Sequence, residues 1–387
     1  MKSQSLPQTA DAVVIGAGVV GASTALALTE AGLRVVVVDR GSVASGTTGA
    51  GEGNILVSDK EPGAELTLAL RSRDLWFEVA DRIGNNFELE AKGGVVVARK
   101  DPTPLFHFAE KQTGAGVKTE RADSQGLRHL EPHLATNIDA GVFYPQDSQC
   151  QPMLAAAHML KYAKQRGASV VNDALVTSIR TSHGIVREVV TNQGSIHTPI
   201  VINATGTWAG EVAALAGSHI PVMPRKGFIL VTEKVPLLIH HKVYDSDYVD
   251  NVASGDADLQ TSTVVEGTRA GTILIGASRE RIGFDRSMNI HILRRLAAQA
   301  TSLFPVLRDI QLLRAYRGFR PYAPDHLPII GEDSSISGLW HSAGHEGAGI
   351  GLAPGSAALI TSLITETAPF MDASPFSPKR FQGSGAA

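Results

Sequence analysis

The stretch Ala12–Asp39 reads AVVIGAGVVGASTALALTEAGLRVVVVD, and it decides the fold class. An apolar β-branched run precedes three glycines, an Ala/Leu-rich run follows them, and a second β-branched run ends at an acid. Apolar β-branched runs are typical of buried strands, and the Ala/Leu-rich run is typical of a helix. The stretch therefore predicts one βαβ unit.

The three glycines of this unit have separate tasks. Gly16 permits the tight turn after the strand, Gly18 lets the backbone approach a pyrophosphate, and Gly21 lets helix and strand pack closely. The helix N-terminus offers N–H groups and a positive dipole end to phosphates. Asp39, 18 residues after Gly21, can accept hydrogen bonds from ribose hydroxyls. The spacing favours an adenine dinucleotide site, and the alternative is a glycine-rich turn without ligand.

Length and composition are those of a globular protein. The chain has 387 residues, of which 43% are hydrophobic and 19% charged, and its formal net charge is −3. This size allows two domains or one large α/β unit, and the charge gives no reason to expect nucleic acid or an anionic membrane as partner. The single cysteine, Cys150, excludes an internal disulfide and a thiolate-ligated iron–sulfur cluster within this chain.

The chain shows no targeting signal in its first residues. Met1–Asp11 is polar and lacks the apolar centre of an export signal. We expect no apolar run of the roughly 18 residues that a membrane span needs. These observations predict a cytoplasmic protein without direct membrane insertion, and no pattern predicts a metal site.

A loop rich in glycine and hydroxyl groups follows Asp39. It includes Ser45-Gly46-Thr47-Thr48 and Gly51-Glu52-Gly53-Asn54. Such a loop is too polar to pack into a core, and it suits donors laid along a phosphate and a ring edge. A flexible surface loop is the alternative, but the position directly after Asp39 favours ligand contact.

Hydrophobic periodicity predicts the remaining elements. Helices are expected over 66–83, 152–166 and 289–304, a strand over 87–98, and three short antiparallel strands between 175 and 197. A buried strand over 199–208 ends at Ala204-Thr205-Gly206, where its backbone can lie beside the dinucleotide. Strand-rich sequence over 222–282 separates two segments of the nucleotide domain, so a second domain inserted in the first is predicted.

A second glycine-rich stretch lies near the C-terminus. Gly344-His345-Glu346-Gly347-Ala348-Gly349-Ile350 precedes Pro354 and a helix expected over 355–367. Glycines before a helix N-terminus again offer amides and a positive dipole end. A fitting partner is the anion that develops at N1–O2 of a reduced flavin. The alternative is a glycine-rich turn with His345 as a packed loop histidine.

These motifs together resemble the D-amino acid oxidase-type (DAO) family of FAD amine oxidoreductases, which includes glycine oxidase, sarcosine oxidase and D-amino acid dehydrogenases. The resemblance covers nearly the whole chain. It rests on the first glycine motif with Asp39, on 204–206, on Arg320-Pro321…Pro324-Asp325…Pro328…Gly331 and on 344–347. Within the family, residues 49–54 and 344–351 look most like the catalytic B (β) subunits of multi-subunit opine dehydrogenases. The flavoprotein chain HcnC of hydrogen cyanide synthase and the β subunits of D-hydroxyproline dehydrogenase are close relatives of these.

The resemblance implies an α/β (α+β) fold with two domains. An FAD-binding, glutathione-reductase-like Rossmann domain would gather residues 1–84, 145–217 and 318–387. An inserted antiparallel β-sheet domain, made of residues 85–144 and 218–317, would bind substrate and cover the flavin ring.

The resemblance also implies the site residues. Arg320 would bind the substrate carboxylate, because a guanidinium is planar, always charged and bidentate; the alternative is a surface arginine beside a proline. His345 would join Arg320 as a catalytic residue, and Tyr244 and Tyr248 would replace an aromatic hydroxyl that relatives carry on the substrate strand. The residues expected to bind FAD are Gly16, Ala17, Gly18, Val19, Val20, Gly21, Asp39, Arg40, Ser45, Gly46, Thr47, Thr48, Gly51, Glu52, Gly53, Asn54, Val176, Ala204, Thr205, Gly206, Trp208, Gly344, His345, Glu346, Gly347, Ala348, Gly349 and Ile350.

The implied reaction is oxidation of the Cα–N bond of an amino or imino acid by hydride transfer to flavin N5. The implied substrate is an opine such as nopaline or octopine, or a related secondary amino acid. FAD would be non-covalent, because Gly318 stands where the sarcosine oxidase branch carries its tethering cysteine. Leu274 aligns with a lysine of oxygen-using sarcosine oxidases, and a leucine cannot stabilise superoxide, so a dehydrogenase is favoured.

The opine-type resemblance implies partner chains. An α subunit and a small γ subunit would carry an iron–sulfur cluster and FMN or a second dinucleotide, in the cytoplasm or peripherally at the inner membrane. A free-standing FAD amino acid oxidase that makes hydrogen peroxide is one alternative. A non-catalytic FAD-holding subunit is another, which Arg320 argues against, and a nicotinamide-dependent dehydrogenase is a third, which the C-terminal glycine motif argues against.

Overall fold

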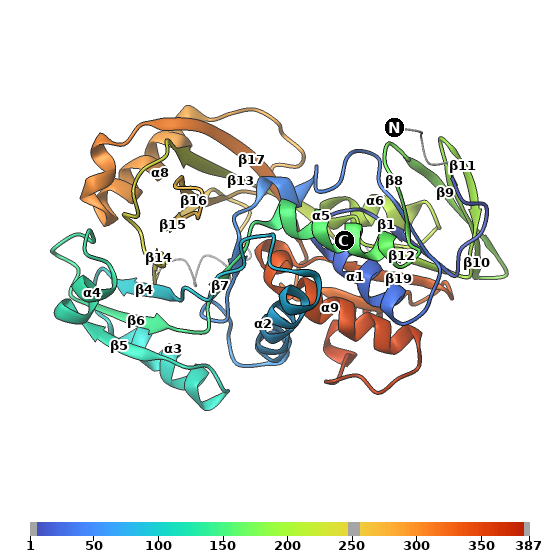
Figure 1. Ribbon diagram of the computed structural model, residues 1–387, viewed down its shortest axis with the longest axis horizontal. Helices are drawn as coiled ribbons and strands as arrows, with labels where there is room; N and C mark the ends of the chain where they lie inside the picture. Colours follow the sequence, from blue (N-terminus) through green and yellow to red (C-terminus); the bar gives the residue numbers. More distant parts are fainter. Residues whose placement is uncertain (1–5, 247–255, 383–387) are drawn as a thin grey trace.

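The computed structural model describes residues 6–246 and 256–382. It contains two large sheets, one toward each end of the long axis of the molecule (Figure 1). Chain segments from both ends of the sequence meet in the first sheet, whereas the second sheet is made of intervening segments.

The first sheet has six strands in the order β18-β19-β12-β1-β2-β8. Its strands are β1 (Ala12–Ile15), β2 (Val35–Val38), β8 (Ser169–Val171), β12 (Ile200–Asn203), β18 (Ile329–Glu332) and β19 (Leu339–Ala343). Neighbouring strands are parallel except β18 and β19, which are antiparallel. Strand β1, helix α1 (Val19–Glu30) and strand β2 form the predicted βαβ unit.

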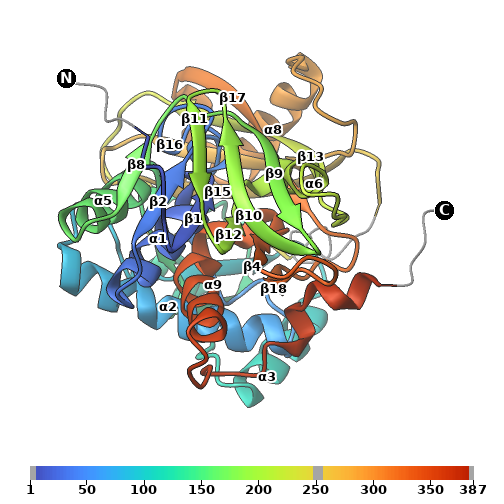
Figure 2. The ribbon, with the colours of Figure 1, turned by 90° about the vertical axis from the view of Figure 1, so that its right-hand side faces the viewer.

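The two faces of this sheet bury different partners. Ala12 and Val14 of β1 belong to a core shared with the helices, whereas Val13 and Ile15 belong to a core shared with a three-stranded antiparallel sheet. The helices are α1, α2 (Ala64–Ile83), α5 (Pro152–Gln165) and α9 (Gly349–Ile364). The small sheet, seen from outside in Figure 2, consists of β9 (Val176–Ser182), β10 (Ile185–Thr191) and β11 (Gly194–His197). This alternation explains why β1 is apolar at every position.

Helix α9 begins at Gly349, before the start at residue 355 that the sequence predicted. Pro354 lies inside the helix, and its nitrogen cannot donate a hydrogen bond to the Ile350 carbonyl. The indole N–H of Trp76 on α2 donates to that carbonyl instead, at 3.0 Å. The prediction was wrong because a side chain from another helix replaces the missing backbone donor.

A second α2 side chain joins the same helix. The Ser72 hydroxyl donates to the Gly351 carbonyl at 2.6 Å and accepts from the Gly355 N–H at 2.9 Å. A Cβ on Gly355 would lie 2.8 Å from the Ser72 Cβ, so the two helices are in close backbone contact here. Helices α2 and α9 are therefore joined by hydrogen bonds as well as by apolar packing.

The stretch Glu346–Ile364 has 19 residues and a mean hydropathy of 1.5, enough in length and composition to cross a membrane. The expectation that no stretch reaches this length was wrong, because its glycine, serine and threonine residues interrupt the apolar pattern without adding charge. A helix in a protein core meets the same criterion, and half of this stretch is buried inside the protein.

The second sheet has eight strands in the order β17-β13-β16-β15-β14-β4-β6-β5. Its strands are β4 (Gly94–Ala98), β5 (Glu120–Asp123), β6 (Ala140–Tyr144), β13 (Met223–Thr232), β14 (Lys242–Asp245), β15 (Gln260–Gly267), β16 (Ile273–Arg279) and β17 (Leu312–Tyr322). Neighbours are antiparallel except β4 and β14. Helix α8 (Ile290–Leu303) packs Leu296 and Ala300 against Phe228 and Leu230 of β13.

Shorter elements complete the described chain. They are β3 (Asn54–Ile55), β7 (Ser148–Gln149), α3 (Thr103–Gly114), α4 (Ser124–Leu130), α6 (Ala209–Ala214) and the 3₁₀ turns η1 (Thr47–Ala50), η2 (Gly206–Trp208), η3 (Pro305–Asp309), η4 (Glu346–Ala348), η5 (Ser374–Phe376) and η6 (Pro378–Phe381). Strand β17 continues to Tyr322 within the second sheet, past the boundary expected at 318. The domain boundaries themselves stay a prediction.

Candidate active site

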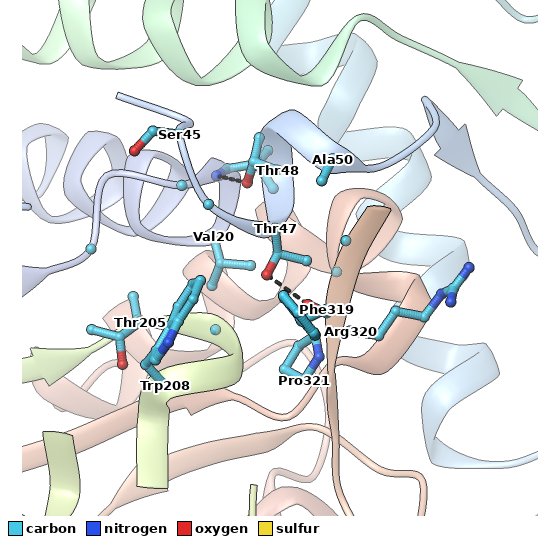
Figure 3. Close-up of a pocket in the computed structure, with 18 of the residues that line it drawn as sticks. Val20, Ser45, Thr47, Thr48, Ala50, Thr205, Trp208, Phe319, Arg320 and Pro321 are labelled. Atoms are coloured by element: carbon cyan, nitrogen blue, oxygen red, sulfur yellow. Dashed lines mark hydrogen bonds between the residues drawn. The ribbon is translucent and has the colours of Figure 1, made fainter. Parts of the chain in front are cut away.

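A cavity of about 900 Å³ lies where the two sheets meet (Figure 3). Its first wall comes from the ends of β1, β2 and β12, the loop after β2, and the start of α9. Its second wall comes from β13 and β17 of the second sheet and from the chain after β16. A volume of this size is near the upper end for ligand sites, which reach about 1,000 Å³.

The glycine fingerprint brings three backbone segments together at the first wall. Gly16 has a φ of +109°, and a Cβ there would lie 2.5 Å from the Ala204 carbonyl oxygen of the chain after β12. A Cβ on Gly21 would lie 1.9 Å from the Gly16 carbonyl oxygen. The close packing of helix and strand predicted for Gly21 is therefore present, and no larger residue fits at either position.

Two neighbouring threonines fix the loop after β2 to both walls. The Thr48 hydroxyl accepts a hydrogen bond from the Val19 N–H at the start of α1, at 3.0 Å. The Thr47 hydroxyl donates to the Phe319 carbonyl of β17, at 2.9 Å. Figure 3 shows the two side chains leaving η1 in different directions. The predicted flexible-loop alternative is excluded for this part of the loop.

Asp39 lies at the end of β2 and lines the cavity. Its Oδ2 accepts from the Ala17 N–H at 2.7 Å, and its Oδ1 accepts from the Gly41 N–H at 2.8 Å. A carboxylate has about four lone-pair sites, so acceptor capacity remains for a ribose hydroxyl. Asp39 thus orients the glycine turn and can bind ligand as well.

The start of α9 presents Gly347, Gly349 and Ile350 to the cavity. His345 is 3% exposed, and its Nε2 lies 2.9 Å from the Ser356 hydroxyl. Burial lowers the pKa of His345 to about 4, so the ring is neutral at pH 7. Positive potential at this end of the cavity therefore comes from the helix N-terminus and not from the imidazole.

Glu346 links the two walls of the cavity. It forms an ion pair with Arg225 of β13, and its Oε2 lies 3.0 Å from Nδ1 of His326. Burial raises the pKa of Glu346, but the hydrogen bond from His326 and the charges of Arg225 and Arg279 lower it more, so the net pKa is below its usual range. The turn before α9 is thereby tied to the second sheet as a carboxylate.

These residues fit an adenine dinucleotide carrying a flavin. The turn at Gly16 and the start of α1 suit a pyrophosphate, Asp39 suits a ribose, and the start of α9 suits an electron-rich ring edge. No group of three or more His, Cys, Asp or Glu side chains in the described part of the chain is placed to hold a metal ion.

Arg320 of β17 lines the second wall. Its Nη1 donates to the Ser278 carbonyl of β16 at 2.8 Å. Gly227 of β13 makes room for it, since a Cβ there would lie 2.2 Å from Nη1. Sequence reasoning missed Gly227, although a glycine within a strand often marks the close approach of another group.

Most predicted site residues line the cavity, and their roles stay predictions. Those that line it are Gly16, Gly18, Val19, Val20, Asp39, Arg40, Ser45, Gly46, Thr47, Thr48, Gly51, Glu52, Asn54, Val176, Ala204, Thr205, Gly206, Trp208, Arg320, His345, Glu346, Gly347, Gly349 and Ile350. Ala17, Gly21, Gly53, Gly344 and Ala348 do not line it. Gly53, for example, is held by hydrogen bonds to Cys150 and Glu266 behind the wall.

Two assignments outside the first wall were wrong. Tyr244 is fully buried in the core, and its hydroxyl donates to Ser58, so it does not reach the cavity. Leu274 does not line the cavity either, because it lies farther along β16, paired with Val231 and Glu266. Tyr248 lies outside the described residues.

An aromatic group at the second wall was also missed. Phe284 stacks on Trp208, with ring centroids 5.6 Å apart and planes at 4°, and both line the cavity with Phe319. Arg40 lies over the other part of this group, 4.0 Å from the Trp208 ring centre. Only Trp208 and Arg40 lie near a recognised motif, so Phe284 carried no signal in the sequence.

Cys150 is buried and does not line the cavity, which agrees with the core role predicted for it. Burial raises the pKa of its thiol, because the charged form would lose its hydration. A thiol in this environment is a poor nucleophile.

Comparison with known proteins agrees with this geometry. The profile of the DAO family, described as FAD dependent oxidoreductase, matches residues 11–363. Hydrogen cyanide synthase subunit HcnC of Pseudomonas aeruginosa is 29% identical, with 98% of each chain covered, and the glycine oxidase of the same organism is 28% identical, with 95% of this chain and 98% of that protein covered. The crystal structure of L-proline dehydrogenase from P. horikoshii superposes with a TM-score of 0.89 at 25% identity, covering 99% of this chain and 100% of that one. A profile match over most of the chain, onto a cavity that fits the cofactor, shows that the chain belongs to the DAO family of FAD-dependent oxidoreductases.

Proposed function

We propose that this chain is the catalytic subunit of a dehydrogenase that oxidises the Cα–N bond of an amino or imino acid, either an opine or a related secondary amino acid. FAD, when bound, supplies the hydride acceptor. The observation that carries the proposal is Arg320, a guanidinium held at the cavity wall by Ser278 and given room by Gly227.

Arg320 suits a carboxylate for geometric and electrostatic reasons. A guanidinium offers two parallel donors to a carboxylate and stays charged at all relevant pH values. With Nη1 fixed on the Ser278 carbonyl, the side chain is already oriented before the ligand arrives. An amino acid bound by its carboxylate has its Cα held within the cavity, where orientation contributes most to the rate.

A multi-subunit assembly is supported by the similarity to HcnC, which is itself named as a subunit. The proposed partners are an α and a small γ subunit that carry an iron–sulfur cluster and FMN or a second dinucleotide. Cys150, the only cysteine of this chain, is buried, so electrons leaving FAD would need such a partner or a quinone. The proposed location is the cytoplasm, or the inner membrane surface through the partners.

A free-standing oxidase is the second candidate. Similarity to glycine oxidase supports it, and so does Lys242, whose ammonium lies 3.1 Å from Glu52 at the cavity wall. An ammonium near a reduced flavin can stabilise superoxide as it forms. Glu52 and Glu266 both pair with Lys242 and reduce its effect, which keeps the dehydrogenase as our first proposal.

The experiment that tests the proposal is a substrate screen with the purified, FAD-loaded chain. Amino acids, N-substituted amino acids and opines are added without oxygen, and bleaching of the flavin bands is followed. Turnover with an artificial dye is then compared with peroxide formation in air. Fast dye reduction with slow peroxide formation supports a dehydrogenase, equal rates support the oxidase, and no bleaching by any amino or imino acid contradicts both.

A further inference from the structure

Glu52 is a buried carboxylate on the wall of the cavity. It follows η1, lines the cavity, and is 7% exposed. Its Oε2 accepts from the Asn54 amide at 2.8 Å and pairs with Lys242 at 3.1 Å. Its Oε1 is buried without a hydrogen-bond partner among the described residues. A buried carboxylate oxygen without a donor is costly, so this atom is a candidate for a donor supplied by a ligand.

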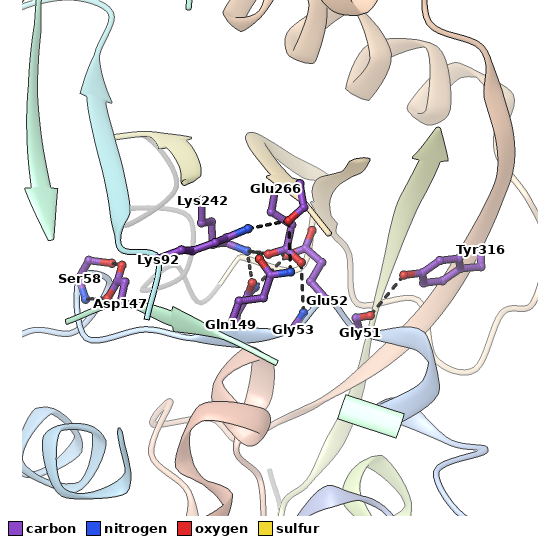
Figure 4. A network of polar contacts seen from close by, with 12 residues as sticks. Gly51, Glu52, Gly53, Ser58, Lys92, Asp147, Gln149, Lys242, Glu266 and Tyr316 are labelled. Carbon is purple, nitrogen blue, oxygen red and sulfur yellow. Dashed lines mark hydrogen bonds and ion pairs between the residues drawn. The ribbon is translucent and has the colours of Figure 1, made fainter. Parts of the chain in front are cut away.

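The carboxylate is held as an anion by its surroundings (Figure 4). Burial raises the pKa of Glu52, but the charge of Lys242, the hydrogen bond from Asn54 and the charge of Arg320 lower it more, so the net pKa is below its usual range. Lys242 also pairs with Glu266 at 2.9 Å, so two carboxylates share this ammonium. Glu52 therefore keeps negative charge that one shared cation does not fully balance.

Glu52 and Arg320 meet the same strand at neighbouring positions. Glu52 Oε1 lies against Gly276 of β16, where a Cβ would be 2.4 Å away, and Arg320 Nη1 donates to the Ser278 carbonyl. Positions two residues apart on an extended strand are about 7 Å apart. The carboxylate and nitrogen of one α-amino acid, with a hydrogen bond of about 2.9 Å at each end, span a separation of this size.

We propose that Glu52 accepts a hydrogen bond from the nitrogen of the substrate whose carboxylate Arg320 binds, and so selects amino and imino acids over carboxylates that lack an N–H group. This assignment rests on the proposed function, and it gives Glu52 a contact with substrate in place of the FAD contact predicted from the sequence. The carboxylate torsion of a glutamate is broad, so rotation of this group can turn Oε1 toward the cavity.

The reaction gives this contact a second effect. When the hydride leaves Cα with its electron pair, the nitrogen lone pair forms the C=N bond and positive charge develops on nitrogen. A carboxylate beside that nitrogen stabilises the charge as it forms. Glu52 would then contribute to the rate as well as to binding, whereas Gln at this position would keep the acceptor and lose the charge.

The test compares Glu52→Gln with Glu266→Gln, which removes the other carboxylate bound to Lys242 but does not line the cavity. For each holoenzyme we would measure FAD content, kcat/KM for the amino acid that bleaches the wild-type flavin, and Ki for the carboxylic acid of the same skeleton without nitrogen. For Glu52→Gln we expect kcat/KM to fall about 10- to 100-fold, Ki to change less than about twofold, and FAD content to stay at the wild-type level. For Glu266→Gln we expect kcat/KM and Ki to change by the same factor.

Other outcomes would overturn the assignment. Loss of FAD from Glu52→Gln would make Glu52 a cofactor residue. Equal effects of Glu52→Gln on kcat/KM and on Ki would show that it does not recognise the nitrogen. Both outcomes leave the proposed function intact if the wild-type flavin is bleached by amino acids, whereas a wild type that no amino or imino acid bleaches contradicts the proposed function itself.

Discussion

The two walls of the cavity are built in different ways. The first wall consists largely of backbone, with glycines at Gly16, Gly347 and Gly349 and the starts of α1 and α9. The second wall consists of side chains that act through charge, among them Arg320 on β17 and Lys242 behind Glu52. Backbone amides bind phosphate and ring edges whatever the substrate, whereas fixed charges discriminate between substrates. The comparison indicates that cofactor binding and substrate choice can change independently in this protein.

The largest effect is expected from Gly21→Val, which attacks the first wall. A Cβ would lie 1.9 Å from the Gly16 carbonyl, so α1 and β1 would have to separate. We expect a loss of about 4 kcal/mol or more in the free energy of unfolding and no FAD in the purified protein. Gly114→Ala, where a Cβ meets nothing within 4 Å, is the matched control. Stable, yellow Gly21→Val protein would show that the βαβ packing is not required.

Arg320→Ala attacks the second wall and should leave the first intact. We expect kcat/KM to fall by about 2–4 kcal/mol, mostly through KM, because the substrate carboxylate loses its charged partner. FAD content should match the wild type. Arg314→Lys, an exposed change on the same strand, serves as control. Unchanged kinetics in Arg320→Ala would remove Arg320 from the site and the main support for an amino acid substrate.

The pH dependence of stability tests whether the first wall is uncharged at His345. Because its folded pKa is about 4, below the ordinary value of 6.5, the unfolded chain binds a proton that the folded chain does not between these pH values. Stability should therefore fall as pH decreases from 6.5 to 4, by up to about 3 kcal/mol. His345→Gln should reduce this slope in Tm against pH, and the exposed His291→Gln should not. Identical slopes in all three proteins would contradict a neutral His345.

The smallest effect is expected from Asp39→Asn. The carboxylate accepts two backbone hydrogen bonds through separate oxygens, and an amide has one acceptor oxygen. We expect FAD affinity to weaken by about 1–2 kcal/mol, or roughly 5- to 30-fold in Kd, measured by titrating apoprotein with FAD. Asp11→Asn, at an exposed ion pair with Arg34, is the control. An unchanged Kd would show that Asp39 contributes nothing to cofactor affinity.

The first wall could be predicted because its determinants are contiguous. One stretch of 28 residues, Ala12–Asp39, contains both strands, the helix and the glycines, and local periodicity is enough to recognise them. The three antiparallel strands β9 to β11 were also predictable, because short turns connect them. The start of α9 was not, since Pro354 is a local signal for a helix end that Trp76 overrides from a distant part of the chain.

The second wall could not be read in this way. Lys242 and Tyr244 lie two residues apart on β14, yet Lys242 binds Glu52 and Tyr244 binds Ser58 in the core. The same chain pattern thus contains one residue near the cavity and one far from it. Their separation depends on how β14 is placed against a loop almost 200 residues earlier in the sequence, with a spacing of 190 between Lys242 and Glu52. Register across such distances has no local signal.

The hydrogen bonds between α2 and α9 have a consequence for the order in which the protein is made. Ser72 and Gly351 are 279 residues apart, so the first turns of α9 cannot complete their hydrogen bonds until nearly the whole chain has left the ribosome. The βαβ unit emerges first, but the start of α9, which closes the same cavity, emerges last. We therefore expect nascent chains to expose an open FAD site throughout synthesis, and cofactor to be retained only after the C-terminal helix has docked on α2.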